Sequence, residues 1–231
     1  MVWLRLLYLY PTAVSDDLID LLAAGRRLLP YVDVPLQHAS NGMLKAMRRG
    51  VTSERQYSLV RRLRQAIPDL TLRTTFLVGF PGETADDFEQ LCDFVRECRF
   101  DRVGVFRYSD EEGTRAFELP DKVPTEVARE RHHRLCELQG EIMAEKLAAL
   151  VGREVTLLVD ESFGSRAQAR MPSQAPEIDG IVHLKATRIG PARRVEAAEA
   201  GLGVRAGSLV RARITGVCGD VDLEAEPLPC D

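Results

Sequence analysis

The chain has 231 residues, of which 45% are hydrophobic and 29% are charged, and its formal net charge is −4. This composition is typical of an ordinary globular protein with one large or two modest domains. The slightly acidic balance gives no general reason to bind nucleic acid, whose phosphates attract lysine and arginine. No apolar run approaches the roughly 20 residues of a membrane span, so we predict a cytoplasmic protein.

Up to about residue 150, strands alternate with helices along the chain. Strands are predicted at residues 2–9, 28–36, 72–78 and 100–108. Helices are predicted at residues 16–24, 42–49, 54–67, 85–98 and 125–150. This alternation argues for parallel β/α units with right-handed crossovers, and thus for an α/β fold. Asn41 and Ser53 are predicted to cap the second and third helices.

The stretch from Leu72 to Thr84 organises this part of the chain. Its strand is apolar and β-branched, which predicts burial on both faces, as in a parallel sheet. The strand ends in Gly79-Phe80-Pro81-Gly82, a segment that lets backbone approach another group closely. Thr84 then caps a helix. Ligands in α/β folds bind at the carboxyl ends of strands, so we predict a binding site at this turn.

After residue 150 the pattern changes to short β-rich segments separated by Gly, Pro and Asp. They lie at residues 155–159, 180–184, 208–214 and 221–223. This spacing predicts a small all-β barrel of about 80 residues, with the domain boundary at residues 150–152. The arginine-rich stretch at residues 188–194 is predicted to be a solvated hairpin or loop.

Cysteine and histidine give no sign of a metal site. The five cysteines, an odd number, do not suggest a disulfide framework. Cys92 falls on the apolar face of a predicted helix and Cys136 lies similarly on a later one, so both are predicted to fill core space. His132 and His133 lie on a charged helix face and are predicted to be solvated. No pair of cysteines has a spacing typical of metal ligands.

Several segments resemble the methylthiotransferase branch of the radical S-adenosylmethionine (radical SAM) enzymes. They are residues 6–11 (LLYLYP), 34–40 (VPLQHAS), 72–84 (LRTTFLVGFPGET) and 106–114. The terminal barrel looks like the TRAM domain that follows the catalytic domain in that family. Within the branch, residues 37–40 (QHAS) and 175–180 (APEIDG) resemble the ribosomal protein methylthiotransferases rather than the relatives that modify tRNA.

The resemblance implies a partial radical SAM (β/α) barrel over residues 1–150 and a TRAM β-barrel over residues 151–231. The implied reaction adds a methylthio group to the β-carbon of an aspartate in a small-subunit ribosomal protein, using S-adenosylmethionine and two 4Fe-4S clusters. Family members carry a Cys-x-x-x-Cys-x-x-Cys loop that binds one cluster, and this sequence has none. We therefore expect a C-terminal fragment or truncated product that retains no catalytic residue and is inactive alone.

The resemblance also implies part of a nucleotide-binding wall at the glycine turn. The backbone of Val78, Gly79 and Phe80 would lie against adenine, where a Cβ at position 79 would obstruct the approach. The alternative that does not depend on the resemblance is that the two glycines serve only to form a tight turn between strand and helix. Tyr108 ends the last strand at the same barrel mouth, with a binding or a merely structural role.

Four polar residues are predicted around this wall, each with an alternative. Arg73 would pair with the carboxylate of S-adenosylmethionine, or form an internal salt bridge with Asp33 or Glu83. Gln37 and Ser40 would approach the ribose or the amino-acid group, or serve as turn residues before the next helix. Glu83 would be a ligand or a support, or a solvated acid in a first helical turn.

The net charge of the barrel indicates which kind of partner it binds. Residues 152–231 contain ten basic and twelve acidic side chains. A tRNA-binding barrel should be basic, whereas a faintly acidic one suits a basic ribosomal protein. Arg170, Glu177 and Asp179 are predicted to face that partner, unless the barrel is only a stability module whose charges keep it soluble. The rival functions are a tRNA methylthiotransferase and a non-enzymatic TRAM binding module.

Overall fold

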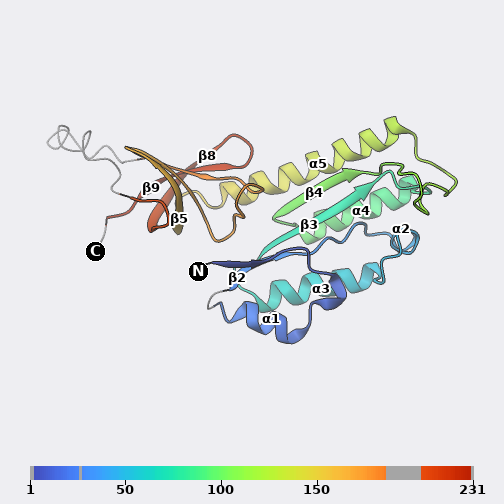
Figure 1. Cartoon of the computed structure of the whole chain (residues 1–231), viewed down its shortest axis with the longest axis horizontal. Coiled ribbons are helices and arrows are strands. Elements are labelled where there is room, and N and C mark those ends of the chain that lie inside the picture. Colours follow the sequence, from blue (N-terminus) through green and yellow to red (C-terminus); the bar gives the residue numbers. More distant parts are fainter. Residues whose placement is uncertain (1–2, 26–27, 186–203, 230–231) are drawn as a thin grey trace. The chain divides into compact units, whose positions relative to one another are not determined.

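The structure is a computed structural model that describes residues 3–25, 28–185 and 204–229. The chain divides into two compact units, Met1–Ile142 and Met143–Asp231, and the division falls within a helix (Figure 1). The arginine-rich stretch at residues 188–194 lies outside the described residues. No described helix is both long and apolar enough to cross a membrane.

The first unit is built on a four-stranded parallel sheet in the order β1-β2-β3-β4, which confirms the predicted α/β alternation (Figure 1). Its strands are β1 (Leu4–Leu6), β2 (Leu28–Asp33), β3 (Thr71–Val78) and β4 (Arg102–Arg107). Its helical elements are η1 (Pro11–Ala13), α1 (Asp16–Ala23), α2 (Asn41–Ala46), α3 (Ser53–Ala66), α4 (Ala85–Cys98) and α5 (Thr125–Ala148), which continues into the second unit. The first predicted strand is therefore much shorter than expected.

Only one face of β3 is fully buried, so the prediction of burial on both faces is wrong. Thr74, Phe76 and Val78 are fully buried, whereas Thr75 and Leu77, which alternate with them, are half-buried. Successive right-handed crossovers place the helices on a single face of such a sheet. The apolar run of β3 is thus shared between a packed helix-covered face and a more open face.

The capping residues of α2 and α3 lie one position earlier than predicted. Ser40, not Asn41, accepts from the Met43 amide of α2, and Thr52, not Ser53, caps α3. In both places a hydroxyl directly precedes the predicted cap and reaches the third amide of the helix. The cap at Thr84 is confirmed, with a complete capping box formed with Asp87.

The second unit is a closed barrel in the order β5-β6-β7-β9-β8 (Figure 1). Its strands are β5 (Glu154–Phe163), β6 (Arg166–Arg170), β7 (Val182–Lys185), β8 (Leu209–Cys218) and β9 (Asp222–Pro227). Strand β6 was not predicted, because its inward residues Ala167 and Ala169 are small and weakly β-forming. They are nevertheless fully buried and complete the barrel core.

The cysteines occupy different environments. Cys92 is buried in the core of the first unit as predicted, whereas Cys136 is exposed, contrary to prediction. Among the residues that the structure describes, no group of three or more His, Cys, Asp and Glu side chains is arranged to hold a metal ion.

Candidate functional site

The glycine turn lies where the carboxyl ends of three parallel strands meet. The Tyr108 amide, just after β4, donates to the Val78 carbonyl at the end of β3 at 2.9 Å. Gln37, which follows β2, continues the pairing with β3, because its amide donates to the Thr75 carbonyl and its carbonyl accepts from the Leu77 amide. The predicted residues Gln37, Val78 and Tyr108 are therefore joined through backbone at one edge of the sheet.

Gly79 is constrained by the protein itself. Its φ is +77°, in the left-handed region that glycine adopts without strain. A Cβ added at this position would lie 2.6 Å from the Cβ of Ala128 on α5. The resemblance attributes the need for glycine at position 79 to a bound adenine. The packing of α5 against the turn already requires glycine there. Gly82 also has a positive φ, +82°, but nothing lies within 4 Å of its added Cβ.

Glu83 is a buried support of this turn and not a solvated acid. Its carboxylate accepts a hydrogen bond from the Gly79 amide. It also lies 3.3 Å from His38 Nε2 and 3.1 Å from Arg131 Nη1 of α5. The side chains of Glu83 and His38 are fully buried, and that of Arg131 nearly so. The turn is therefore held by one carboxylate that is compensated by a guanidinium and by hydrogen bonds.

His38 links the two family-like motifs. Its Nδ1 accepts from the Ser40 amide at 3.0 Å, so the ring proton lies on Nε2 and is directed at Glu83. Ser40 Oγ donates to the carboxylate of Asp87 in the first turn of α4. Ser40 is thus buried and engaged as a helix cap, which is the structural alternative considered for it. His38, which the sequence left unassigned, fastens residues 37–40 to the glycine turn.

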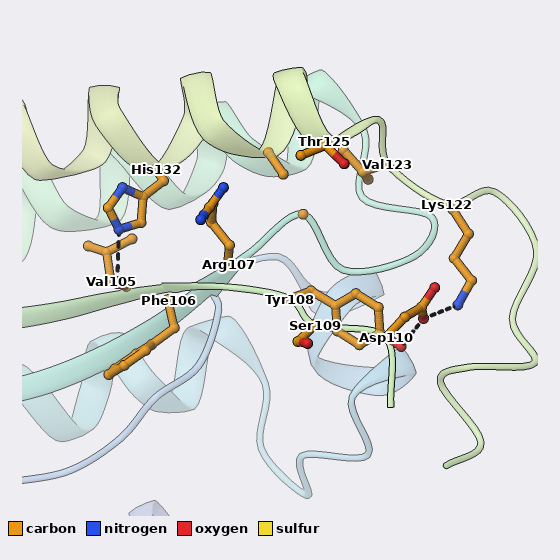
Figure 2. A pocket seen from close by; sticks show the side chains of 12 residues that line it. Val105, Phe106, Arg107, Tyr108, Ser109, Asp110, Lys122, Val123, Thr125 and His132 are labelled. Carbon is orange, nitrogen blue, oxygen red and sulfur yellow. Dashed lines mark hydrogen bonds and ion pairs between the residues drawn. The ribbon is translucent and has the colours of Figure 1, made fainter. Parts of the chain in front are cut away.

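A cavity of about 550 Å³ adjoins the turn and the end of β4 (Figure 2). Tyr108 lines this cavity and forms an edge-to-face pair with Phe80, with ring centroids 5.2 Å apart, and Phe80 itself lines a separate hollow of about 360 Å³. The Tyr108 hydroxyl donates to Asp110 at 2.7 Å, and Lys122 Nζ also bonds this carboxylate (Figure 2). Desolvation and the acidic neighbour raise the pKa of Tyr108 to about 12, whereas the bonds from Lys122 and Tyr108 lower the pKa of Asp110.

The other wall of this cavity belongs to α5. Figure 2 shows His132 reaching from α5 to β4 and Arg107 extending from β4 toward α5. His132 Nε2 lies 3.2 Å from the Val105 carbonyl, so the prediction that His132 is solvated is wrong. Arg107 is exposed and has no ion pair within the described part of the chain. Neither residue was predicted to belong to the site, because His132 stands on a charged helix face and Arg107 ends a strand without a local signal.

Arg73 forms the internal salt bridge that was one of its two predicted roles. Its Nη1 lies 3.0 Å from Asp33 Oδ2, and the paired residues face one another in the β2–β3 register. The same oxygen accepts from the Tyr8 amide at 3.2 Å. Arg73 precedes Val78 by five positions, which places it about 16 Å along the strand from the turn. It is therefore not part of the cluster around Gly79.

Of the three barrel residues predicted to face a partner, one has a free side chain. Arg170 Nε contacts both carboxylate oxygens of Asp160, at 2.9 and 3.1 Å. The Asp179 carboxylate accepts from the Ala175 amide at 2.8 Å and so closes the turn. Glu177 is exposed, has a φ of +68°, and forms no ion pair or side-chain hydrogen bond with the residues that the structure describes.

Comparisons with known proteins match both parts of the chain. A family model described as the radical SAM superfamily matches residues 7–95, and one described as the TRAM domain matches residues 151–228. The ribosomal protein uS12 methylthiotransferase RimO of Sorangium cellulosum is 48% identical over 98% of this chain and 44% of its own length. RimO of Klebsiella pneumoniae is 51% identical over 82% of this chain and 43% of its own. RimO of Azoarcus is 47% identical over 97% of this chain and 47% of its own length. The chain thus spans somewhat less than half the length of these curated relatives.

Proposed function

Because this chain belongs to the RimO-type family of radical SAM methylthiotransferases, we propose that it supplies the adenosyl-facing wall and the TRAM barrel of such an enzyme. The proposed reaction adds a methylthio group to the β-carbon of an aspartate in ribosomal protein uS12. S-Adenosylmethionine and two 4Fe-4S clusters would supply the radical and sulfur chemistry. The proposed domain boundary lies at residues 150–152, and the proposed location is the cytoplasm.

The described residues fit one of these cofactors and not the other. A cluster needs three thiolates and an open iron site, but Cys92 and Cys98 are buried on one helix while Cys136 and Cys218 lie on other elements. The cluster ligands are therefore proposed to come from outside this sequence, and the chain alone is proposed to be inactive. The glycine turn, in contrast, lines through Gly79 a cavity whose size accommodates a nucleoside, and the ring of Tyr108 lines the same cavity.

The observation that carries the proposal is the meeting of Gln37, Gly79, Phe80 and Tyr108 at one edge of the parallel sheet. We propose that the backbone of residues 78–80 and the ring of Tyr108 flank the adenosyl group. The Gln37 side chain, which forms no hydrogen bond within the described residues, lines the neighbouring hollow of about 360 Å³ and would orient a polar group of the ligand from that side. Ser40 and Glu83 would act behind this wall by fixing its position, and Arg73 by fixing β2 against β3.

In the barrel, the proposed partner is a basic segment of uS12 and the proposed contact residue is Glu177. Its carboxylate is exposed and lacks a partner within the described residues, which favours an ionic contact with another molecule. Arg170 and Asp179 are proposed to shape this surface through their internal bonds rather than to touch the partner.

Two binding measurements test the proposal. Titration of the chain with S-adenosylmethionine by calorimetry should show binding that Gln37→Ala weakens and that a non-enzymatic TRAM module would lack. Fluorescence anisotropy with labelled uS12 and labelled tRNA should show preferential binding of uS12, reduced by Glu177→Lys but not by Glu137→Lys on α5. Tight binding of tRNA without binding of uS12 would instead assign the chain to the tRNA-modifying branch.

A further inference from the structure

A cluster of basic side chains borders the edge of the sheet that carries the glycine turn. We call it the arginine patch, and its members are Lys45, Arg48, Arg49 and Arg115. Two neighbouring hollows of about 360 and 610 Å³ share Arg48 and Arg49 as lining residues. Arg115 lines the first hollow and Lys45 the second, so the four cations form one continuous surface.

The patch is strongly positive in a chain whose net charge is −4. No Asp or Glu is among the described residues that line the two hollows. Lys45, Arg48 and Arg115 are exposed and form no ion pair with described residues. Arg49 is held in place, because its Nη2 donates to the Pro35 carbonyl at 2.8 Å and its guanidinium lies 4.8 Å from the Tyr10 ring.

The acids near the patch do not neutralise it. Glu54 is hydrogen-bonded by Asn41, which lines the second hollow, and its carboxylate makes no ion pair with the patch. Glutamates at positions 111, 112 and 118 share the exposed loop of Arg115 but do not line the first hollow. The positive charge is therefore available to an external anion.

The backbone conformation of Arg48 allows its side chain to be removed cleanly. Arg48 has a φ of +55° at the end of α2, where its amide donates to the Lys45 carbonyl and the Arg49 amide donates to the Leu44 carbonyl. This is the hydrogen-bond pattern of a helix terminus that normally places glycine at the position of Arg48. Arginine is less favourable than glycine in this conformation, so Arg48→Gly removes the side chain without destabilising the helix terminus.

We propose that the arginine patch binds the phosphate groups of RNA beside the site at which the ribosomal protein is modified. Guanidinium groups match phosphate oxygens in a two-pronged geometry, and three of the four cations have no competing partner within the described residues. The choice of RNA among polyanions rests on the proposed function, because a ribosomal protein is presented next to ribosomal RNA. The position and the positive charge of the arginine patch are independent of the proposed function.

Binding to phosphates has a measurable signature. Each phosphate contact with a single strand adds about 0.7 to the slope of log affinity against log salt concentration. The loss of one contact should therefore weaken binding at 0.1 M salt by roughly fivefold and lower this slope by about 0.7.

The decisive variant is Arg48→Gly in the full chain. Glycine relieves the left-handed backbone, so the melting temperature should rise by about 2–4 °C while RNA affinity falls. Arg99→Gly is the matched control, because Arg99 is also exposed, ends helix α4 and has a φ of +45°. It lies at the start of β4, at the opposite end of the sheet from the patch. Arg115→Glu provides a second probe, since this exposed loop position does not affect a helix terminus.

The probe is a fluorescein-labelled 12-nucleotide single-stranded RNA, followed by anisotropy from 50 to 200 mM KCl. We expect micromolar binding that Arg48→Gly and Arg115→Glu weaken and that Arg99→Gly leaves unchanged. Absence of RNA binding, or equal effects of the two glycine variants, would overturn the proposal. So would competition by polyglutamate as effective as that by unlabelled RNA. Binding of uS12, measured in parallel, tests the proposed function separately, and Arg48→Gly should leave it intact if uS12 binds through the barrel.

Discussion

Replacement of Gly79 by alanine separates the demands of the fold from those of a ligand. Gly79 and Gly82 have nearly the same φ, +77° and +82°, and differ in what an added Cβ would meet. Alanine in the left-handed region costs about 1–2 kcal/mol, which is the whole effect expected at Gly82. At Gly79 the clash with Ala128, at 2.6 Å, adds about 1–3 kcal/mol. Gly79→Ala should therefore cost about 2–5 kcal/mol in total.

The second half of this experiment is a double-mutant cycle with Ala128→Gly. Glycine at position 128 of α5 costs about 1 kcal/mol on its own, but it removes the atom that meets the new Cβ. The pair Gly79→Ala and Ala128→Gly should thus show a favourable coupling of about 1–3 kcal/mol, whereas Gly82→Ala should be additive with Ala128→Gly.

The assay is urea unfolding followed by the fluorescence of Trp3, the single tryptophan, which reports on the first unit alone. Zero coupling between positions 79 and 128, or equal losses for the two glycine variants, would refute the packing argument. Calorimetry on the double variant then addresses the ligand. Recovered stability without recovered affinity for S-adenosylmethionine would show that the cofactor also requires bare backbone at Gly79.

Three further predictions concern other contacts of the two units. Glu83→Gln should lower the free energy of unfolding by about 3 kcal/mol, because it leaves the guanidinium of Arg131 without its buried counter-charge; an unchanged urea midpoint would contradict this. Burial favours a higher pKa for Asp87, but hydrogen bonds from two hydroxyls and a backbone amide outweigh it and hold the pKa below the ordinary 3.8. The contribution of the Asp87 carboxylate to the free energy of unfolding is therefore complete above about pH 4 and is lost as the pH falls through the lowered pKa. Asp87→Asn removes this contribution, so the stability of the variant, measured by circular dichroism, should depend less on pH between about pH 4 and 2. Gly180→Ala should destabilise the barrel by about 2 kcal/mol or more, because the added Cβ would lie 2.1 Å from the Val221 carbonyl oxygen. The amide NMR signals of the barrel should therefore be lost at a lower temperature than in the parent chain, and an unchanged temperature would contradict this prediction.

The fold was predictable where local patterns carry the information. Alternating strands and helices defined the parallel sheet, and the segment from Gly79 to Thr84 defined a turn followed by a capped helix, both of which the structure contains. Local patterns failed where small or polar residues do the packing. Strand β6 buries Ala167 and Ala169 rather than large β-branched residues, so periodicity did not detect it.

The site was less predictable because its contacts join residues far apart in the sequence. Arg73 could be assigned a ligand or an internal partner, and only the register of β2 against β3 selects Asp33. Arg131 stands on a helix rich in exposed charges, and nothing local distinguishes it from its neighbours. Its role follows from the packing of α5 against the glycine turn, where its partner Glu83 stands 48 residues earlier in the sequence.

The double engagement of His38 narrows the choice of groups that could carry protons in any reaction at this edge. Nδ1 accepts a hydrogen bond from the Ser40 amide and Nε2 is hydrogen-bonded to Glu83. The imidazole therefore has no lone pair or hydrogen for a substrate unless one of these hydrogen bonds breaks. A chemist seeking an acid or a base here should accordingly look to groups that face the opening, such as the Tyr108–Asp110 pair, or to groups contributed by another polypeptide segment.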